Sequence, residues 1–367
     1  MRIRKGQTLT WYVLKELSGT FFFGVMAFTV LLVAGDLLFK IADLIIERGV
    51  SFWVVIRLFW YRLPSVVILT LPMSCLLSTL LSFGRLSASN EIVALNASGV
   101  SFQRILKPVL IASFIVGALS LLLNETLVPL SNRAAENLMK YEIAREKPSL
   151  LKERVFLRDE SNGQLHRVIY ISRLMPREGS MRDILVQEFT DGRLSRITTA
   201  EKGSWINNRW TLEKGEVFQV DPTGSVELMY RFKNQEIELD LSPREVSRAT
   251  RNPSEMGMFE LIDHIRLVSK QGVNVQPLWV TFHLRIAVPL ASIVLAIIGS
   301  AFGVTPQRRG TGFGFGLSIL IVFAYYVVMS FSKSFGQSGH ISPVLAAWIP
   351  NIVFSIFGIF LVRRVSH

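Results

Sequence analysis

Few residues in this 367-residue chain have the spacing that catalysis requires. The sequence has no GxxxxGK[ST] loop for nucleotide phosphates, no HExxH zinc motif, no GxSxG nucleophile turn and no CxxC pair. The single cysteine, Cys75, lies in an apolar run, as is typical of a packing residue, and the five histidines are scattered without metal-ligand spacing. The sequence therefore predicts no catalytic site, no metal site and no cofactor, which leaves binding by charged groups.

The charged segment Gly84–Lys107 is the best candidate for such binding. It lies between two long apolar runs and carries Arg85, Glu91 and Arg104. Charged side chains are costly in hydrocarbon, so this segment must lie outside any membrane that the flanking runs cross. We therefore expect it to contact a soluble partner or water.

A short helix is predicted inside this segment, at about residues 86–98. Ser87 or Ser89 is able to cap its first turn, and Gly99 is suited to end it in a left-handed conformation. Four residues give this helix a moderately apolar side: Ile92, Val93, Leu95 and Ala97. A capped helix between two membrane spans suits the docking of a soluble motor protein, and an ordinary charged loop fits the spacing equally well.

The elements that must position this segment are membrane spans. Half of the residues are hydrophobic, and the mean hydropathy is +0.39. A bilayer core of about 30 Å is crossed by about 20 helical residues. Six runs have that length: residues 17–35, 63–83, 109–130, 286–304, 313–331 and 343–362. No signal-peptide cleavage site follows the first run, so we predict six retained transmembrane helices.

The formal charge of +12 is distributed in a way that argues against a nucleic-acid-binding face. Residues 131–276 carry 23 Lys and Arg against 22 Asp and Glu, so this block is nearly neutral. The rest of the chain carries 17 against 6, and most of these cations flank the apolar runs. Because such cations collect on the cytoplasmic side, the pattern predicts that both termini and the segment Gly84–Lys107 are cytoplasmic and that residues 131–276 are outside.

A polar stripe follows the first apolar run. It consists of Asp36, Lys40, Asp43 and Glu47, which recur at helical spacing. Arg57 and Arg62 come shortly afterwards among Trp and Tyr side chains, a composition typical of a membrane–water interface. The stripe fits a solvated helix end and also fits a polar face that is turned towards a cavity or towards lipid headgroups.

Residues 131–276 differ in character from the rest of the chain. Nine short β-rich runs are separated by turn signals: residues 154–158, 166–172, 183–189, 193–200, 203–205, 209–213, 216–220, 226–232 and 235–241. Short strands at this spacing indicate a sandwich or a jelly roll. The predicted fold is therefore membrane α-helical, with spans one to three in residues 1–130, an extracytoplasmic jelly-roll-like all-β domain with flanking helices in 131–276, and spans four to six in 277–367.

The chain resembles the permease family that exports lipopolysaccharide from the bacterial inner membrane (LptF/LptG, or YjgP/YjgQ). The segments that carry the resemblance are GRLSASNEIVALNASGVS at 84–101, PSEMGMFELIDHIRLVSKQG at 253–272, HLRIAVPLASIVLAIIGSAFG at 283–303, RRGTGFGFGLSILIVFAYY at 308–326 and SPVLAAWIPNIVF at 342–354. The resemblance covers the whole length. It implies a multi-pass inner-membrane transport subunit that is not itself an enzyme.

The resemblance also implies partners and site residues. The partners are a paralogous permease subunit, a cytoplasmic ATPase dimer that holds ATP and Mg, a periplasmic bridge protein of similar β fold, and the lipopolysaccharide itself. Glu91 matches the acidic residue of the helix that docks on the ATPase, and Arg85 and Arg104 flank it. Lys40 is the best match for a cation that contacts lipid phosphates, followed by Arg57 and Arg62.

Two other classes of protein also fit the sequence, a membrane-anchored enzyme and a scaffold or sensor. A membrane-anchored enzyme that acts on envelope lipids, or a scaffold or sensor, would have the β-domain as its working part. A clustered Ser/His/Asp or metal site in the β-domain would favour the enzyme, and copurification of an ATPase would favour transport over a scaffold. A lipoprotein exporter fits less well, since permeases of that class usually have four spans with the insert after the first.

Overall fold

The structure, a computed structural model, describes residues 5–37, 43–47, 49–143, 152–161, 164–175, 178–190, 192–206, 209–221, 224–237, 252–269, 274–304 and 311–365. The chain forms two compact units. The helical unit comprises residues 1–139 and 276–367, and the inserted unit comprises residues 140–275. We describe each unit by itself.

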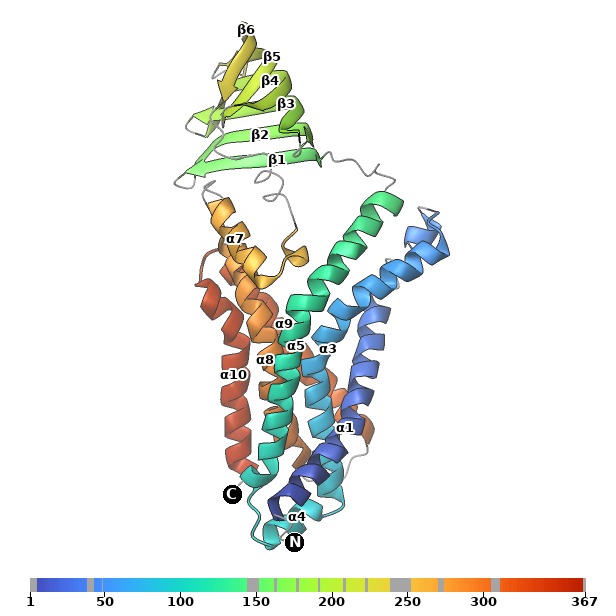
Figure 1. Ribbon diagram of the computed structural model, residues 1–367. Helices are drawn as coiled ribbons and strands as arrows, with labels where there is room; N and C mark the ends of the chain where they lie inside the picture. Colours follow the sequence, from blue (N-terminus) through green and yellow to red (C-terminus); the bar gives the residue numbers. More distant parts are fainter. Residues whose placement is uncertain are drawn as a thin grey trace. The chain divides into compact units, whose positions relative to one another are not determined.

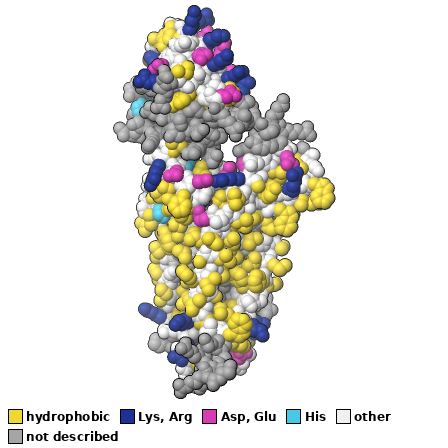
Figure 2. All heavy atoms as spheres, in the orientation of Figure 1, with side chains coloured by type: hydrophobic (Ala, Val, Ile, Leu, Met, Phe, Trp, Pro, Cys, Tyr) yellow, Lys and Arg dark blue, Asp and Glu magenta, His cyan; other side chains and the backbone are white. Residues whose placement is uncertain are grey.

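The helical unit contains six helices that are long and apolar enough to cross a membrane. They are α1 (Lys5–Leu32), α3 (Phe52–Ala88), α5 (Phe102–Leu138), α8 (Gln276–Val304), α9 (Thr311–Gln337) and α10 (Pro343–Val365). Figure 2 shows a broad hydrophobic surface around the middle of this unit, with charged side chains beyond it. The predicted architecture of six spans with an inserted all-β domain is confirmed.

Two ends of the helical unit are used as landmarks below. The first residues of α1, the last residues of α10 and the short helix α4 (Glu91–Ala97) lie at one end, which we call the terminal end (Figure 1). The other end, where α5 ends and α8 begins, we call the insert end, because the inserted unit is joined to the helical unit there. The start of α1 and the end of α10 therefore lie on one side of the spans.

The centre of the helical unit is formed by α3 and α8. Of their most apolar stretches, 78% and 67% are buried, compared with 17–39% in the other four spans. Gly299 and Gly303 of α8 face α3, where a Cβ on Gly299 would lie 2.1 Å from Oγ1 of Thr79 and 2.5 Å from the carbonyl of Leu76. Lipid tails are as apolar as the helices, so spans associate through close packing of this kind. The Gly299–Gly303 pair allows the two central helices to approach closely.

Hydroxyl groups attach α1 to α3. Residues with hydroxyl groups recur at every fourth position of α3, at Thr70, Ser74, Ser78 and Ser82, and the last two of them donate to α1. The Ser78 hydroxyl donates to the carbonyl of Leu17 (2.8 Å) and the Ser82 hydroxyl to the carbonyl of Glu16 (3.1 Å). Oγ of Ser82 also lies 2.8 Å from Oγ1 of Thr20. Hydrogen bonds between spans contribute about 0.6–2 kcal/mol each in hydrocarbon, so this ladder is a main attachment of a helix that is otherwise weakly buried.

A buried polar network connects α8, α9 and α10. Pro350 cannot donate to the carbonyl of Ala346, and the Ser332 hydroxyl donates to that carbonyl instead (2.6 Å). The Tyr325 hydroxyl donates to Oδ1 of Asn351 (2.9 Å), and the amide of Asn351 donates to the backbone carbonyl of α8 at Ala287 (2.7 Å). Side chains of neighbouring helices thus satisfy polar groups within the apolar spans.

The inserted unit is built on one antiparallel sheet whose strand order follows the sequence. The strands are β1 (Lys152–Ser161), β2 (Gln164–Met175), β3 (Ser180–Thr190), β4 (Arg193–Ile206), β5 (Arg209–Val220) and β6 (Val226–Ile237). Its core includes Ile171, Met181, Trp210 and Leu212. The amphipathic helix α7 (Met258–Ser269) belongs to the same unit, and its Leu267 packs against this core.

Six long strands replace the nine runs expected from the sequence. The three extra breaks fall at 201–202, 214–215 and 233–234, and none of them is a turn. One row of residues drops out of the ladder pairing across the sheet: Arg154, Ser172, Asp183, Glu201, Lys214 and Lys233. Asp183 and Lys214 in this row both have φ of +51°, which is costly for residues with a Cβ. The polar residues that interrupt the hydrophobic runs therefore lie at irregular positions within continuous strands, and not in turns.

The α3–α8 crossing can be tested with one pair of glycine variants. Gly299→Ala should destabilise the protein by about 1–3 kcal/mol, because the added methyl overpacks against Thr79 and Leu76. Gly316→Ala is the matched control, since a Cβ there meets no atom within 4 Å and alanine is the better helix former. The thermal midpoint of the detergent-solubilised chain can be followed with a thiol-reactive dye, because Cys75 is buried and is the only cysteine. Equal midpoints for the two variants would contradict the assigned crossing.

Candidate coupling site at the terminal end

The short helix α4 begins after a sharp break from α3. Helix α3 ends at Ala88, and Asn90, with φ of +60°, takes the N-cap position of α4. The capping predicted for Ser87 or Ser89 is wrong. The Ser87 hydroxyl donates to the carbonyl of Val304 on α8 (2.9 Å), and no side chain caps the first turn of α4. The chain changes direction abruptly between α3 and α4, and the left-handed conformation of Asn90 makes this change. No serine is therefore placed to cap the first turn of α4.

The end of α4 follows the prediction. Gly99 has φ of +84°, which it adopts without the penalty that a Cβ would bring. The amide of Gly99 donates to the carbonyl of Asn96 (2.9 Å), and that of Val100 donates to the carbonyl of Leu95 (3.0 Å). This pair of bonds is a Schellman motif, which satisfies carbonyls that the helix end would leave open. Both ends of α4 are thus sharply defined.

Helix α4 has one held face and one exposed face. Ile92 is only 2% exposed and packs into the terminal-end core with residues such as Val13 and Phe83. On the side away from this core Val93 is 61% exposed. The small residues Ala94 and Ala97 are exposed on the same side. Single exposed apolar side chains are common on protein surfaces, so this face of α4 is accessible to a partner but does not by itself identify one.

Glu91 is hydrogen-bonded within its own chain. The Tyr12 hydroxyl of α1 donates to Oε2 of Glu91 (2.5 Å), and the Ser89 hydroxyl donates to Oε1 (2.9 Å). These two bonds favour the ionised form, so they hold the pKa of the Glu91 carboxyl below its ordinary value. The acidic residue of the predicted docking helix therefore connects α4 to the first span.

A second contact joins the same elements. Arg85, in the last turn of α3, forms an ion pair with Glu16 of α1. Glu16 lies one helical turn beyond Tyr12, and its backbone carbonyl also accepts the Ser82 hydroxyl (3.1 Å). Two successive turns of α1 are thus linked to the α3–α4 corner by charged or hydrogen-bonded side chains. The structure brings Glu91 and Arg85 together around α1.

Arg104 lies apart from this cluster. It is exposed in the first turn of α5, and among the described residues neither a hydrogen bond nor an ion pair joins it to Glu91. The sequence did not single out Tyr12 and Glu16, although both lie at the terminal end of a span. Their spacing of four residues, which places them on one helix face, was the available signal.

The predicted lipid-contacting cations lie at the insert end or outside the described residues. Lys40 lies outside the described residues. Arg57 is exposed on α3, and Arg62 is 4.0 Å from Glu136 of α5. A further pair, Arg285 of α8 and Glu125 of α5, is 3.8 Å apart within the spans.

The Arg285–Glu125 pair differs from the others in its burial. The two side chains are only 12% and 23% exposed. Charged residues inside spans are costly and are usually paired, so this pair connects α5 and α8 where neither charge would be stable alone.

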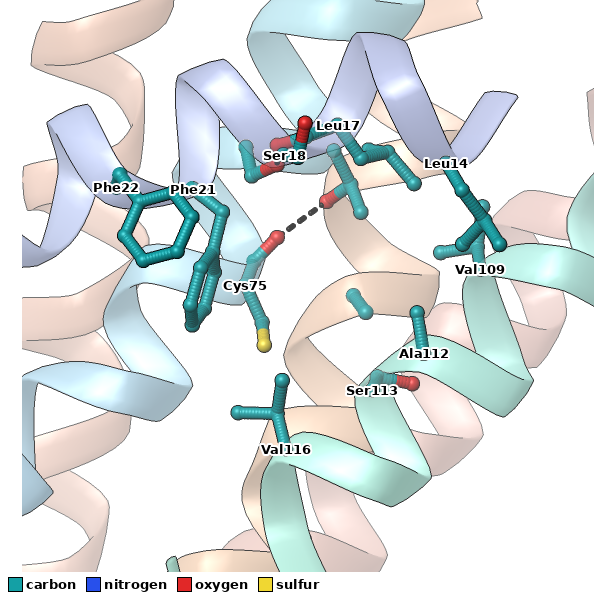
Figure 3. Close-up of a pocket in the computed structure, with 13 residues that line it drawn as sticks. Leu14, Leu17, Ser18, Phe21, Phe22, Cys75, Val109, Ala112, Ser113 and Val116 are labelled. Atoms are coloured by element: carbon teal, nitrogen blue, oxygen red, sulfur yellow. Dashed lines mark hydrogen bonds between the residues drawn. The ribbon is translucent and has the colours of Figure 1, made fainter. Parts of the chain in front are cut away.

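An apolar groove of about 200 Å³ lies between α1, α3 and α5 in the terminal half of the spans. Figure 3 shows side chains of these helices around one space, with the thiol of Cys75 directed into it. The lining consists of Leu14, Leu17, Ser18, Phe21, Phe22, Cys75, Ser78, Thr79, Val109, Ala112, Ser113, Val116 and Ala296. Within the described part of the chain, no cluster of three or more His, Cys, Asp or Glu side chains is suited to hold a metal ion.

Comparison with known proteins connects this arrangement to one family. The family model described as "Lipopolysaccharide export system permease LptF/LptG" matches residues 11–364. The lipopolysaccharide export system permease protein LptG of Escherichia coli K12 is 21% identical over 369 residues, which cover 96% of this chain and 98% of that protein. The protein of the same name from Escherichia coli O6:H1 matches to the same extent.

The link between α1 and α4 yields a prediction for Tyr12. Tyr12→Phe removes the hydroxyl that donates to Glu91, so amide hydrogen exchange in residues 91–98 should become about two- to threefold faster, as expected for one exposed charge-assisted bond. The pKa of Glu91 should rise towards its ordinary value. Since the carboxylate accepts this bond, the difference from wild type should be full at neutral pH and should shrink as the pH falls through the lowered pKa.

Tyr61→Phe, at the exposed insert end of α3, is the matched control and should leave exchange in residues 91–98 unchanged. Equal exchange in wild type and Tyr12→Phe at neutral pH would contradict the contact.

Proposed function

The chain belongs to the LptF/LptG family of lipopolysaccharide export system permeases, and we propose that it uses ATP hydrolysed by a separate protein to extract lipopolysaccharide from the inner membrane. The ATP-driven step is proposed from the geometry of α4. This short helix has two defined ends, one face packed against the spans and one exposed face. The chain has no P-loop of its own, so the work of extracting a lipid must be supplied by a partner.

The exposed face of α4 is the proposed docking surface for an ATPase dimer, in which ATP and Mg would be bound. Val93 supplies an apolar contact at its centre, and Glu91 and Arg85 supply charges at its edge. Arg104, exposed in the next helix, is a third candidate contact. Apolar anchors surrounded by polar groups are the usual composition of such interfaces.

Movement of α4 would be transmitted to α1 through the two contacts described above. The Tyr12–Glu91 hydrogen bond and the Arg85–Glu16 ion pair join the docking helix to the first span. The hydroxyl ladder then couples the same part of α1 to α3. A displacement of α4 would therefore be transmitted first to α1, whose most apolar stretch is the least buried of the six spans.

The insert end is the proposed side for contact with lipid phosphates. Lys40, Arg57 and Arg62 are the cations proposed for this contact. Arg57 is exposed, and Arg62 lies 4.0 Å from Glu136. The family resemblance places Lys40 first among the three candidates.

The proposed topology places the terminal end in the cytoplasm and the inserted unit in the periplasm. The charge pattern of the sequence supports it, because Lys and Arg collect before the first span, in the segment Gly84–Lys107, between the fourth and fifth spans and after the sixth span. The ATPase surface and the inserted unit would then lie on opposite sides of the inner membrane.

The inserted unit is proposed to pass lipid to a periplasmic bridge protein of similar β fold. Strand β6 is at one edge of the sheet, and most of its side chains are exposed. A strand edge offers backbone groups to an added strand of another chain. The lipid-transport unit would be completed by a paralogous permease, which would cover exposed apolar side chains of α1 and α9 such as Phe23 and Phe323.

Charge reversal on α4 tests the proposed ATPase contact. Glu91→Lys should release the ATPase or uncouple its hydrolysis from transport, because the reversed charge repels a basic partner surface and loses the bond from Tyr12. Copurification of the ATPase and release of lipopolysaccharide from proteoliposomes are the measurements. Glu260→Lys, an exposed charge reversal in the inserted unit, is the control. Normal ATPase assembly and lipid release in Glu91→Lys would remove Glu91 from the coupling site.

Charge reversal at the insert end tests the phosphate contacts. Lys40→Glu and Arg57→Glu should each lower photocrosslinking to lipopolysaccharide by about fivefold or more, as expected for the loss of a cation near lipid phosphates. Arg62→Glu should lower crosslinking in the same direction, because it also removes a cation from the insert end. ATPase copurification is the control readout and should not change. Unchanged crosslinking in Lys40→Glu would remove that residue from the lipid site.

A further inference from the structure

We propose that the groove between α1, α3 and α5 binds one acyl chain of an anionic glycerophospholipid, whose phosphate is held by Lys15. This site is separate from the cations at the insert end and does not depend on the proposed transport function. It depends only on the assignment of these helices as membrane spans.

The chemistry of the groove selects a hydrocarbon. Apart from apolar side chains, its lining contains four hydroxyl groups, and each of them donates to a backbone carbonyl. The bonds run from Ser18 to Lys15, from Ser78 to Leu17, from Thr79 to Cys75 and from Ser113 to Leu110. The hydroxyl groups are thus already satisfied within the chain. A polar ligand would gain little in this groove, and water has too few partners there to be stable.

The size and position of the groove favour a chain over a helix. Its volume is about 200 Å³. One turn of an α-helix with side chains is about 10–12 Å across and 5.4 Å long, so it occupies about 400 Å³ or more and would not fit. Buried residues such as Cys75 and Val109 form its floor. Ser18 and Phe22 at its rim are exposed, so the groove opens along α1 into the space that surrounds the spans. Inside a bilayer that space is filled by acyl chains.

The face of α1 that borders the groove has the composition of a membrane interface. Trp11, Lys15, Ser18 and Phe22 follow one another at steps of four, three and four residues, so they form one helix face. Trp11 is 71% exposed and Lys15 is exposed, both nearer the terminal end than the groove. Tryptophan and lysine occupy the headgroup level of spans, and phenylalanine the hydrocarbon. A phosphate beside Lys15 would place its acyl chain along Ser18 and Phe22.

Photocrosslinking in nanodiscs tests the proposal. The full chain, with any copurified partners, is placed in phosphatidylethanolamine–phosphatidylglycerol nanodiscs that contain phosphatidylglycerol with a diazirine in one acyl chain. After irradiation, mass spectrometry of peptides should find adducts on residues 109–116 and on Phe21 or Phe22. Ala112→Trp should lower these adducts about threefold or more, because the indole fills the groove and removes the contacts that the chain would make. Leu119→Trp, on the exposed face of α5, is the matched control and should not lower them.

A second pair of measurements keeps the test valid if Ala112→Trp does not fold. Lys15→Glu should lower adducts from the phosphatidylglycerol probe more than those from a phosphatidylcholine probe, because the choline cation of the latter offsets the charge of its phosphate. In detergent, added phosphatidylglycerol should slow the reaction of Cys75 with N-ethylmaleimide, and the label is unambiguous because Cys75 is the only cysteine.

Three outcomes would overturn the site. The first is an adduct yield in the groove no higher than on the exposed residues Leu119 and Leu122. The second is competition by unlabelled lipopolysaccharide but not by unlabelled phosphatidylglycerol, which would assign the groove to the transported lipid. The third is protection of Cys75 only when a partner chain is present, without lipid adducts, which would assign the groove to a partner side chain. Loss of ATPase coupling with lipid adducts retained would affect only the proposed function.

Discussion

The close approach of α3 and α8 is the constraint on which the helical unit depends. Hydrocarbon gives helices no hydrophobic reason to associate, so the two central spans must gain their attraction from packing. Gly299 and Gly303 permit this, since a side chain at either position would enter α3. The other four spans are arranged around this pair and are less buried. Substituting either glycine would therefore disturb the support of every other helix.

Helix α1 is attached in a different way. Its contacts with α3 include a ladder of hydroxyl groups and backbone carbonyls, and its terminal end is joined to α4 and to the end of α3 by Tyr12 and Glu16. These hydrogen bonds and this ion pair fix the position of α1 along α3. A single one of them can be replaced by another bond without opening the packed core between α3 and α8. The central pair is thus the fixed part of the unit, and α1 is the span that is linked most directly to the short helix α4.

The sequence predicted the spans well because a run of about 20 apolar residues has no other common explanation than a transmembrane helix. It predicted the end of α4 for the same kind of reason, since Gly99 is suited to a left-handed position. The strand number was wrong because polar residues such as Lys214 interrupt a hydrophobic run in the same way whether the chain turns or continues through an irregular position. The Tyr12–Glu91 contact joins residues 79 positions apart, and no local pattern encodes such a distance.

The hydroxyl ladder and the groove are two consequences of one sequence feature. Small residues on α3 let α1 approach closely, and their hydroxyl groups are used up by carbonyls of α1 and of α3 itself. The same small side chains leave space where α5 does not reach α1, and no polar capacity remains in that space. A lipid chain lying there would pack on the side of α1 that borders the groove. The position of α1 would then depend on three neighbours of different kinds: the central span α3, the short helix α4 and the membrane lipid itself.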